Sequence, residues 1–155
     1  LLNIGSEHIK GNLVVKKTFD DLKTIYPKMN FYGFIEGNDI NKGVVDVVVT
    51  DGFSGNIALK TAEGVAELIF TFLQNAYKSS IISKIGFLLS KPALNRFKTR
   101  IDPRKYNGAV LLGLNGIVVK SHGGTDAFGF SNAISVAISL IENSYIHEIN
   151  QKLNL

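Results

Sequence analysis

The segment Val44–Val49 constrains the fold more than any other, because it is all valine except for Asp46. A short, nearly continuous apolar run of this kind is typical of a parallel strand that is buried on both faces of a sheet. The glycine-containing segment Asp51–Asn56 follows and predicts a tight loop, and Ile57–Tyr77 then carries apolar residues at helical spacing. This part of the chain therefore predicts a strand, a loop and a helix in succession.

The beginning of the chain shows the same order. An apolar run at Leu1–Ile4 is followed by a polar loop and by Gly11–Tyr26, which predicts a helix that Pro27 ends. A further apolar stretch at Phe31–Ile35 predicts another strand. Strands that alternate with helices indicate an α/β fold.

The end of the chain adds a predicted hairpin. Val110–Leu114 and Ile117–Lys120 flank Asn115-Gly116, which is a strong signal for a two-residue turn. The polar loop 121–126 then leads into a last helix, whose apolar stripe is predicted to contain Phe130, Ile134, Ala137, Ile138, Ile141 and Tyr145. We expect a layered α/β/α, Rossmann-like mixed sheet, with a protruding basic helical segment.

Composition narrows the possible chemistry. With 155 residues, of which 45% are hydrophobic, we expect one globular domain that buries a real core. The absence of cysteine excludes disulfides, thiolate metal sites and a cysteine nucleophile. No apolar stretch reaches the roughly 20 residues that cross a bilayer. Because the chain opens at Leu1 on an apolar run, we interpret it as a fragment.

Residues 78–105 form a basic window with eight basic residues and the single acid Asp102, a net charge of +7, whereas the rest of the chain carries −3. The window predicts a helical hairpin, broken at Pro92, with an apolar side and a cationic rim. The charge suits an anionic partner, namely a membrane surface, an acidic protein or nucleic acid, and a core or dimer-interface helix is as good an interpretation as membrane contact. The candidate contact residues are Ile81, Ile85, Leu88, Leu89, Lys91, Leu94, Arg96, Lys98 and Arg100.

Three polar loops follow predicted strands, where ligands of α/β sheets bind. The loop Asp51–Asn56 offers backbone amides at a helix N-terminus, which favour an anion, and an asparagine side chain that suits a developing oxyanion. The alternative is a turn whose Asp or Asn caps the helix. The candidate phosphate or substrate ligands in this loop are Asp51, Gly52, Ser54 and Gly55, and Asn56 is a candidate catalytic residue.

The other two loops offer similar groups. Lys10-Gly11-Asn12 combines a cation with an amide side chain, although a solvated surface lysine is the more common case. His122, Gly123 and Gly124 form a glycine-rich segment suited to an anion, and the alternative is a histidine that only orders its loop.

Several classes of site are excluded by pattern. The three histidines lack the spacing of a zinc site, and neither a P-loop nor a full dinucleotide fingerprint is present. Ser54 lacks the spacing of a nucleophile elbow, so direct attack by a small bound nucleophile is the simpler mechanism. We expect no metal and no cofactor.

Four motifs in order resemble the PlsX-type phosphate acyltransferases. They are LLNIG with KGN at Lys10–Asn12, TDGFSGNIALKTAEGVAE at Thr50–Glu67, LLSKPALNRFKTRID at Leu88–Asp102 and GAVLLGLNGIVVKSHG at Gly108–Gly123. The resemblance implies an enzyme that makes acyl phosphate from acyl-acyl carrier protein and inorganic phosphate, and a fold akin to isocitrate dehydrogenase and phosphotransacetylase. The lysine and asparagine that function in that family correspond to Lys10 and Asn56.

The same resemblance implies a homodimer in the bacterial cytoplasm, associated peripherally with the membrane. Because proteins of this family are about twice as long, this chain corresponds to the C-terminal half of a single acyltransferase and is expected to be inactive alone. Two other interpretations are a phosphotransacetylase-like enzyme that uses acyl-coenzyme A and a non-catalytic membrane-tethering module. Nucleic-acid binding is the least favoured, because the basic window lacks a recognised reading motif.

Overall fold

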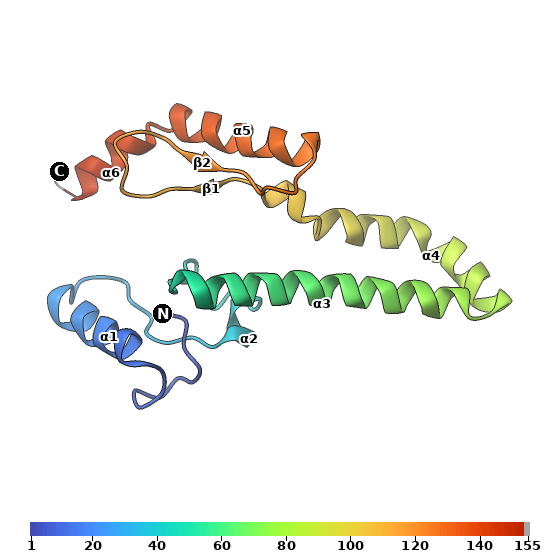
Figure 1. Ribbon diagram of the computed structural model, residues 1–155, viewed down its shortest axis with the longest axis horizontal. Helices are drawn as coiled ribbons and strands as arrows, with labels where there is room; N and C mark the ends of the chain where they lie inside the picture. Colours follow the sequence, from blue (N-terminus) through green and yellow to red (C-terminus); the bar gives the residue numbers. More distant parts are fainter. Residues whose placement is uncertain (154–155) are drawn as a thin grey trace. The chain divides into compact units, whose positions relative to one another are not determined.

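The computed structural model describes residues 1–153, which form two compact units. The first unit comprises residues 1–79 and holds helices α1, α2 and α3, and the second begins at Ser80 and holds the remaining elements (Figure 1). Helices are combined with a small sheet, so the α/β class is confirmed. Among the described residues, that sheet has only two strands, and they lie in the second unit.

In the first unit, the three predicted strands come together without forming an extended ladder. Leu2 and Ile35 form an isolated parallel bridge, and the amide of Asn3 donates to the carbonyl of Ile35 at 2.9 Å. On the other side, the amide of Leu2 donates to the carbonyl of Val49, also at 2.9 Å. Leu1–Ile4 therefore lies between the other two apolar segments.

Helix α1 spans Leu13–Ile25, within the range predicted from the sequence. It begins where the side chain of Asn12 accepts a hydrogen bond from the amide of Val15, and this N-cap satisfies one of the free amides of the first turn. Phe19 fixes the helix to the strand segments, because its ring stacks on Phe34 at 4.4 Å and meets Phe31 edge-on at 5.4 Å between centroids.

The short helix α2 spans Gly37–Ile40, and the long helix α3 spans Gly52–Lys78. The sequence predicted a loop over Asp51–Asn56, but helix α3 already begins at Gly52. The reason is that the carboxylate of Asp51 accepts a hydrogen bond from the amide of Ser54 at 2.8 Å, so Asp51 is the N-cap.

The second unit opens with helix α4, Ile81–Arg100, which contains Pro92. The prediction that Pro92 ends a helix was wrong, since the helix continues through it. Proline in a helix interior removes one backbone hydrogen bond and bends the axis, and α4 changes direction along its length (Figure 1). A short 3-10 helix at Pro103–Tyr106 follows.

The predicted antiparallel pair is confirmed, but its strands are shorter than expected and the predicted two-residue turn at Asn115-Gly116 is not formed. Strand β1, Ala109–Val110, pairs with β2, Val119–Lys120, and residues 111–118 form the connection. Helix α5, Ala127–Glu142, lies alongside the pair, and α6 spans Tyr145–Leu153 (Figure 1). Tyr145 does not extend the stripe of α5 as predicted, because Ser144 has a positive φ of 51° between the two helices.

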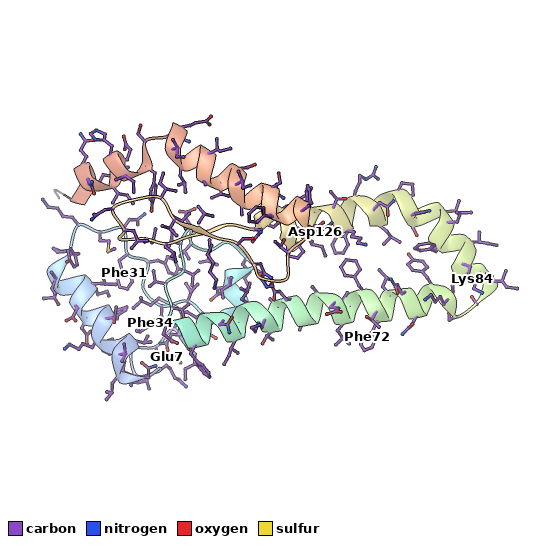
Figure 2. All side chains as sticks on the ribbon, turned by 45° about the horizontal axis from the view of Figure 1, so that its top comes forward. Glu7, Phe31, Phe34, Phe72, Lys84 and Asp126 are labelled. Atoms are coloured by element: carbon purple, nitrogen blue, oxygen red, sulfur yellow. The ribbon has the colours of Figure 1, made fainter. Side chains whose placement is uncertain are left out.

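The expected core is not formed. Among the described residues, the buried hydrophobic side chains are those of Phe34, Ile35 and Ala133, whereas Phe72 on α3 is 63% exposed (Figure 2). Many apolar side chains of the valine-rich segment, of α3 and of α4 stay accessible, including those of Val47, Ile69 and Leu89. No helix within residues 1–153 has the length and apolar character needed to span a membrane.

Candidate functional site

A cleft of about 580 Å³ lies in the first unit, at the point where the helices of that unit begin. Gly11 and Asn12 precede α1, Glu36 precedes α2, and Asp51 precedes α3. The lining residues are Leu2, Asn3, Ile4, Gly11, Asn12, Val15, Glu36, Gly37, Asn38, Asp51 and Ser54. Because α1 and α3 both present their positive N-terminal ends here, the backbone of the cleft favours a bound anion.

Three of the predicted ligands, Asn12, Asp51 and Ser54, line this cleft together although about 40 residues separate the first from the others. Asn12 accepts from the amide of Val15 through Oδ1, at 2.9 Å. The hydrogen bond from the amide of Ser54 lowers the pKa of Asp51, which is therefore ionised at neutral pH. The interpretation of Asp51 as a helix cap is thus correct, and Asn12 caps α1 in the same way; both caps are compatible with a place in the cleft.

The charges of the cleft lining are negative. Glu36 and Asp51 both line it, and no lysine or arginine is among the described lining residues. A phosphate in this cleft needs a cation from outside the lining to offset the two carboxylates. Lys10 lies directly beside the lining residue Gly11, is exposed, and receives a hydrogen bond from Asn3 on its own carbonyl at 3.3 Å.

The remaining predicted residues of the Asp51–Asn56 segment do not line the cleft. Gly52 and Asn56 lie in the first two turns of α3, and both are exposed. A side chain at Gly55 would meet Cγ2 of Thr50 at 2.7 Å, so close packing explains this glycine. Asn56 has no described partner that positions it toward the cleft.

His122, Gly123 and Gly124 lie in the second unit, just before α5. The amide of Gly124 donates to Nδ1 of His122 at 3.2 Å, and the amide of Thr125 donates to the carbonyl of His122 at 3.2 Å. The histidine therefore orders its own loop, as the alternative interpretation held, and its ring remains exposed.

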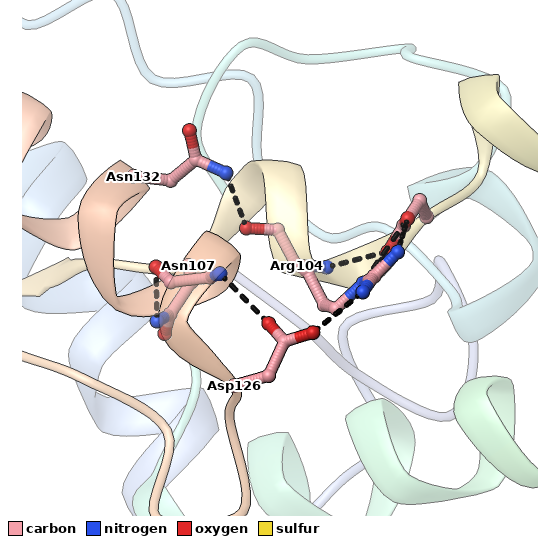
Figure 3. Close-up of polar contacts among 6 residues, drawn as sticks. Arg104, Asn107, Asp126 and Asn132 are labelled. Carbon is pink, nitrogen blue, oxygen red and sulfur yellow. Dashed lines mark hydrogen bonds and ion pairs between the residues drawn. The ribbon is translucent and has the colours of Figure 1, made fainter.

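Arg104 forms ion pairs with two carboxylates in the second unit, a cluster that the sequence did not predict (Figure 3). Its guanidinium contacts Asp102 at 2.6 Å and Asp126 at 2.7 Å. The hydrogen bond from Arg104 lowers the pKa of Asp102 to about 2. The amide of Gly129, and then Arg104, lower the pKa of Asp126, while both carboxylates raise the pKa of Arg104. One of the eight cations of the basic window is thus neutralised locally.

The candidate contact residues of the basic window all lie on α4. The side chains of Ile81, Leu88 and Leu89 are 77%, 68% and 78% exposed, and Ile85 shares their helical face. Leu94 is half-buried, whereas four cations of the helix are exposed, namely Lys91, Arg96, Lys98 and Arg100. The apolar residues and the cations that the sequence assigned to this segment are therefore accessible on one helix.

Sequence reasoning missed Asn3, Glu36 and Asn38, which line the cleft. Each stands at or just after a segment that was predicted as a strand. The signal that selected the Asp51 loop, a polar residue at the carboxyl end of an apolar run, also applied to Glu36-Gly37-Asn38.

Residues 1–148 match the family described as "Fatty acid synthesis protein". The chain belongs to this family. Members similar to it include the phosphate acyltransferases of Paramagnetospirillum magneticum, 56% identical over 154 residues, and Rhodospirillum rubrum, 52% identical over 153 residues. The phosphate acyltransferase of Methylococcus capsulatus is 51% identical over 153 residues. These alignments cover 99% of the chain and 44% of each relative, so the chain spans less than half the length of the family members that it matches.

Proposed function

We propose that this chain is part of a phosphate acyltransferase, which transfers a long-chain acyl group from acyl carrier protein to inorganic phosphate for bacterial phospholipid synthesis. The observation that carries the proposal is the cleft at which the N-termini of α1 and α3 meet Asn12 and Ser54. Family membership and the name of the relatives support the same reaction. In the proposed enzyme, this chain is the C-terminal part, and the remaining sequence completes both the layered α/β/α sheet and the site.

The proposed mechanism begins with phosphate in the cleft. Backbone amides at the two helix N-termini bind its oxygens, and the ammonium group of Lys10 offsets the carboxylates of Glu36 and Asp51. A phosphate oxygen then attacks the thioester carbonyl carbon and forms a tetrahedral intermediate. The C–S bond breaks, the thiolate of the carrier protein leaves, and acyl phosphate is the product.

Asn56 is proposed to donate a hydrogen bond to the oxyanion of the tetrahedral intermediate. Its place on α3 gives it a rigid support near the helix N-terminus, where developing negative charge is favoured. Loss of one such donor typically lowers kcat by about 10²–10³.

The decisive experiment measures acyl phosphate formation from long-chain acyl-acyl carrier protein and phosphate by the full-length protein. We expect Lys10→Ala and Asn56→Ala to lower turnover by about 10²-fold or more. Lys17→Ala on α1 and Asn75→Ala on α3 are matched exposed controls and should keep it. No turnover by the parent protein with this substrate would refute the assignment, and turnover with acyl-coenzyme A instead would favour the phosphotransacetylase-like alternative.

A second role, in peripheral membrane contact, is favoured by the exposed apolar face and the cations of α4. We propose that this helix contacts anionic lipid or the acidic carrier protein in a homodimeric, cytoplasmic enzyme. Leu88→Asp and Leu89→Asp should abolish flotation of the full-length protein with anionic liposomes and leave turnover in solution unchanged. Unchanged flotation would exclude α4 as the membrane contact, whereas a loss of both flotation and turnover would indicate that α4 serves carrier-protein docking, the fold or the dimer.

A further inference from the structure

Asn3 is one of two buried polar residues among those that the structure describes, with a relative exposure of 8%. It lies in the first unit and lines the cleft there. Its side-chain oxygen accepts a hydrogen bond from the amide of Ile4 at 2.9 Å, and its side-chain nitrogen donates one to the carbonyl of Lys10 at 3.3 Å. The oxygen and one of the two amide hydrogens are thus engaged within the protein.

The second amide hydrogen of Asn3 has no acceptor within residues 1–153. By contrast, the other buried polar residue, Asn107, donates both of its amide hydrogens, to Ser121 and to Gly129. A buried N–H group without an acceptor is costly, and such groups are nearly always paired in folded proteins. Because Asn3 lines the cleft, a ligand bound there can supply the acceptor that its second hydrogen lacks.

The orientation of this hydrogen is fixed by the surroundings of the side chain. The carbonyl of Lys10 takes the first hydrogen, and the amide group is planar, so the direction of the second follows from that of the first. The backbone of Gly11 packs directly against the side chain, since an added Cβ would lie 2.9 Å from Cγ of Asn3. The donor is therefore preorganised, which lowers the cost of binding a ligand.

The other donors of the cleft define the chemistry of that ligand. Helices α1 and α3 begin at the cleft, and each leaves amides of its first turn without a helical acceptor. A ligand that meets several N–H donors needs several acceptor oxygens and negative charge, as inorganic phosphate has. A cationic side chain among the lining residues would pair with the carboxylates of Glu36 and Asp51, whereas the neutral amide of Asn3 stays available to the anion.

We infer that Asn3 is a substrate-binding residue: the second hydrogen of its side-chain amide donates to an oxygen of inorganic phosphate in the cleft. The inference rests on the proposed function, to which it adds a donor that is neither a helix amide nor a lysine. Every group that carries it lies in the first unit.

The first measurement is the affinity of the full-length protein for inorganic phosphate, by isothermal titration calorimetry. Asn3→Ala should raise Kd about tenfold or more, because a hydrogen bond to a charged group is lost. If this variant does not fold by circular dichroism, Asn3→Asp takes its place, since it keeps an oxygen for the amide of Ile4 and lacks both donors.

Phe34→Leu is the matched control for a loss of stability alone. Phe34 is buried in the same unit, where it stacks on Phe19, and it is not a lining residue of the cleft. This variant should lower the thermal midpoint of the protein and leave Kd for phosphate unchanged.

A second measurement separates contact with phosphate from support of the Lys10 carbonyl. Full-length protein labelled with ¹⁵N-asparagine gives two side-chain proton signals for Asn3, which are assigned by their loss in the Asn3 variant. We expect phosphate to shift the signal of the second hydrogen more than that of the hydrogen bonded to Lys10.

An unchanged Kd in a folded Asn3 variant would overturn the inference. A raised Kd without a shift of the second hydrogen would also overturn it, because Asn3 would then act only by holding the Lys10 segment. If the parent protein bound no phosphate, the inference and the proposed function would both fail. Phosphate binding that depends on Asn3, without formation of acyl phosphate from acyl-acyl carrier protein, would refute the proposed function alone.

Discussion

Replacing Gly11 by alanine should destabilise the protein more than any other single methyl group added at the cleft. Gly11 has a φ of +86°, which costs an L-residue roughly 1–2 kcal/mol. Its added Cβ would also overlap Oδ1 of the buried Asn3 and lie 2.9 Å from Cγ of the same side chain. Overpacking of this kind typically costs about 1–3 kcal/mol, so the two effects together predict a loss of about 2–5 kcal/mol in the free energy of unfolding.

The matched control is Gly43→Ala in the same unit. Gly43 also has a positive φ, +65°, but a Cβ there would meet nothing within 4 Å. It should therefore lose only the backbone contribution, about 1–2 kcal/mol. Urea unfolding of the full-length variants, followed by circular dichroism, measures the difference between them.

Asn3→Ala tests the same contact from its other side, because it removes the side chain that the new methyl group at Gly11 would displace. The double variant should be more stable than the sum of the two single changes predicts, by about 1–3 kcal/mol. Equal losses for the Gly11 and Gly43 variants, or strict additivity with Asn3→Ala, would refute the claim that Asn3 packs against Gly11.

Three further predictions follow from single contacts. Asn12→Ala removes the acceptor for the amide of Val15 and should lower the free energy of unfolding by about 1 kcal/mol, whereas Asn12→Asp should retain it in the same urea assay. The hydrogen bond from Arg104 lowers the pKa of Asp102 to about 2 in the folded protein. The ionised Asp102 therefore stabilises the fold fully above its unfolded pKa near 4, and this stabilisation is lost as the pH falls toward 2. Between pH 5 and pH 3, the urea midpoint of Asp102→Asn should decrease less than that of the parent protein, and an equal decrease would contradict this. Pro92→Ala should restore a backbone hydrogen bond in α4 and raise the free energy of unfolding by up to about 3 kcal/mol. Thermal unfolding measures the effect, and a midpoint at or below that of the parent protein would show that the bend at Pro92 is favourable.

Local patterns in the sequence predicted the helices well where both ends carried a signal. Helix α1 has a cap at Asn12 and a stop at Pro27, and its observed range, Leu13–Ile25, lies within the predicted one. The start of α3 was misplaced by several residues, because glycines were interpreted as a loop although Asp51 caps the helix before them. At Pro92 the local preference to break a helix is overridden, so propensity alone gave the wrong result.

The candidate site was predictable in part, because it depends on which loops the fold brings together. Asn12, Asp51 and Ser54 each follow an apolar run, and the position of such runs in a sheet correctly indicated that they converge. Glu36 carried the same signal and was not selected, although it also lines the cleft. The hydrogen bonds that the buried Asn107 makes with Ser121, His122 and Gly129 could not be found from sequence, because these partners lie 14–22 residues away and become neighbours only through the packing of α5.

The scarcity of buried apolar side chains has a thermodynamic consequence for this polypeptide by itself. The heat-capacity change of unfolding, ordinarily about 12–15 cal/mol/K per residue, arises mainly from apolar surface that unfolding newly exposes to water. With Phe34, Ile35 and Ala133 as the buried hydrophobic residues of the described chain, little such surface remains to be exposed. The calorimetric unfolding transition of this polypeptide should therefore be broad, and its free energy of unfolding should change little with temperature. When other protein surface covers the apolar faces of α3 and α4, the transition should become sharper and the free energy of unfolding should curve more strongly with temperature.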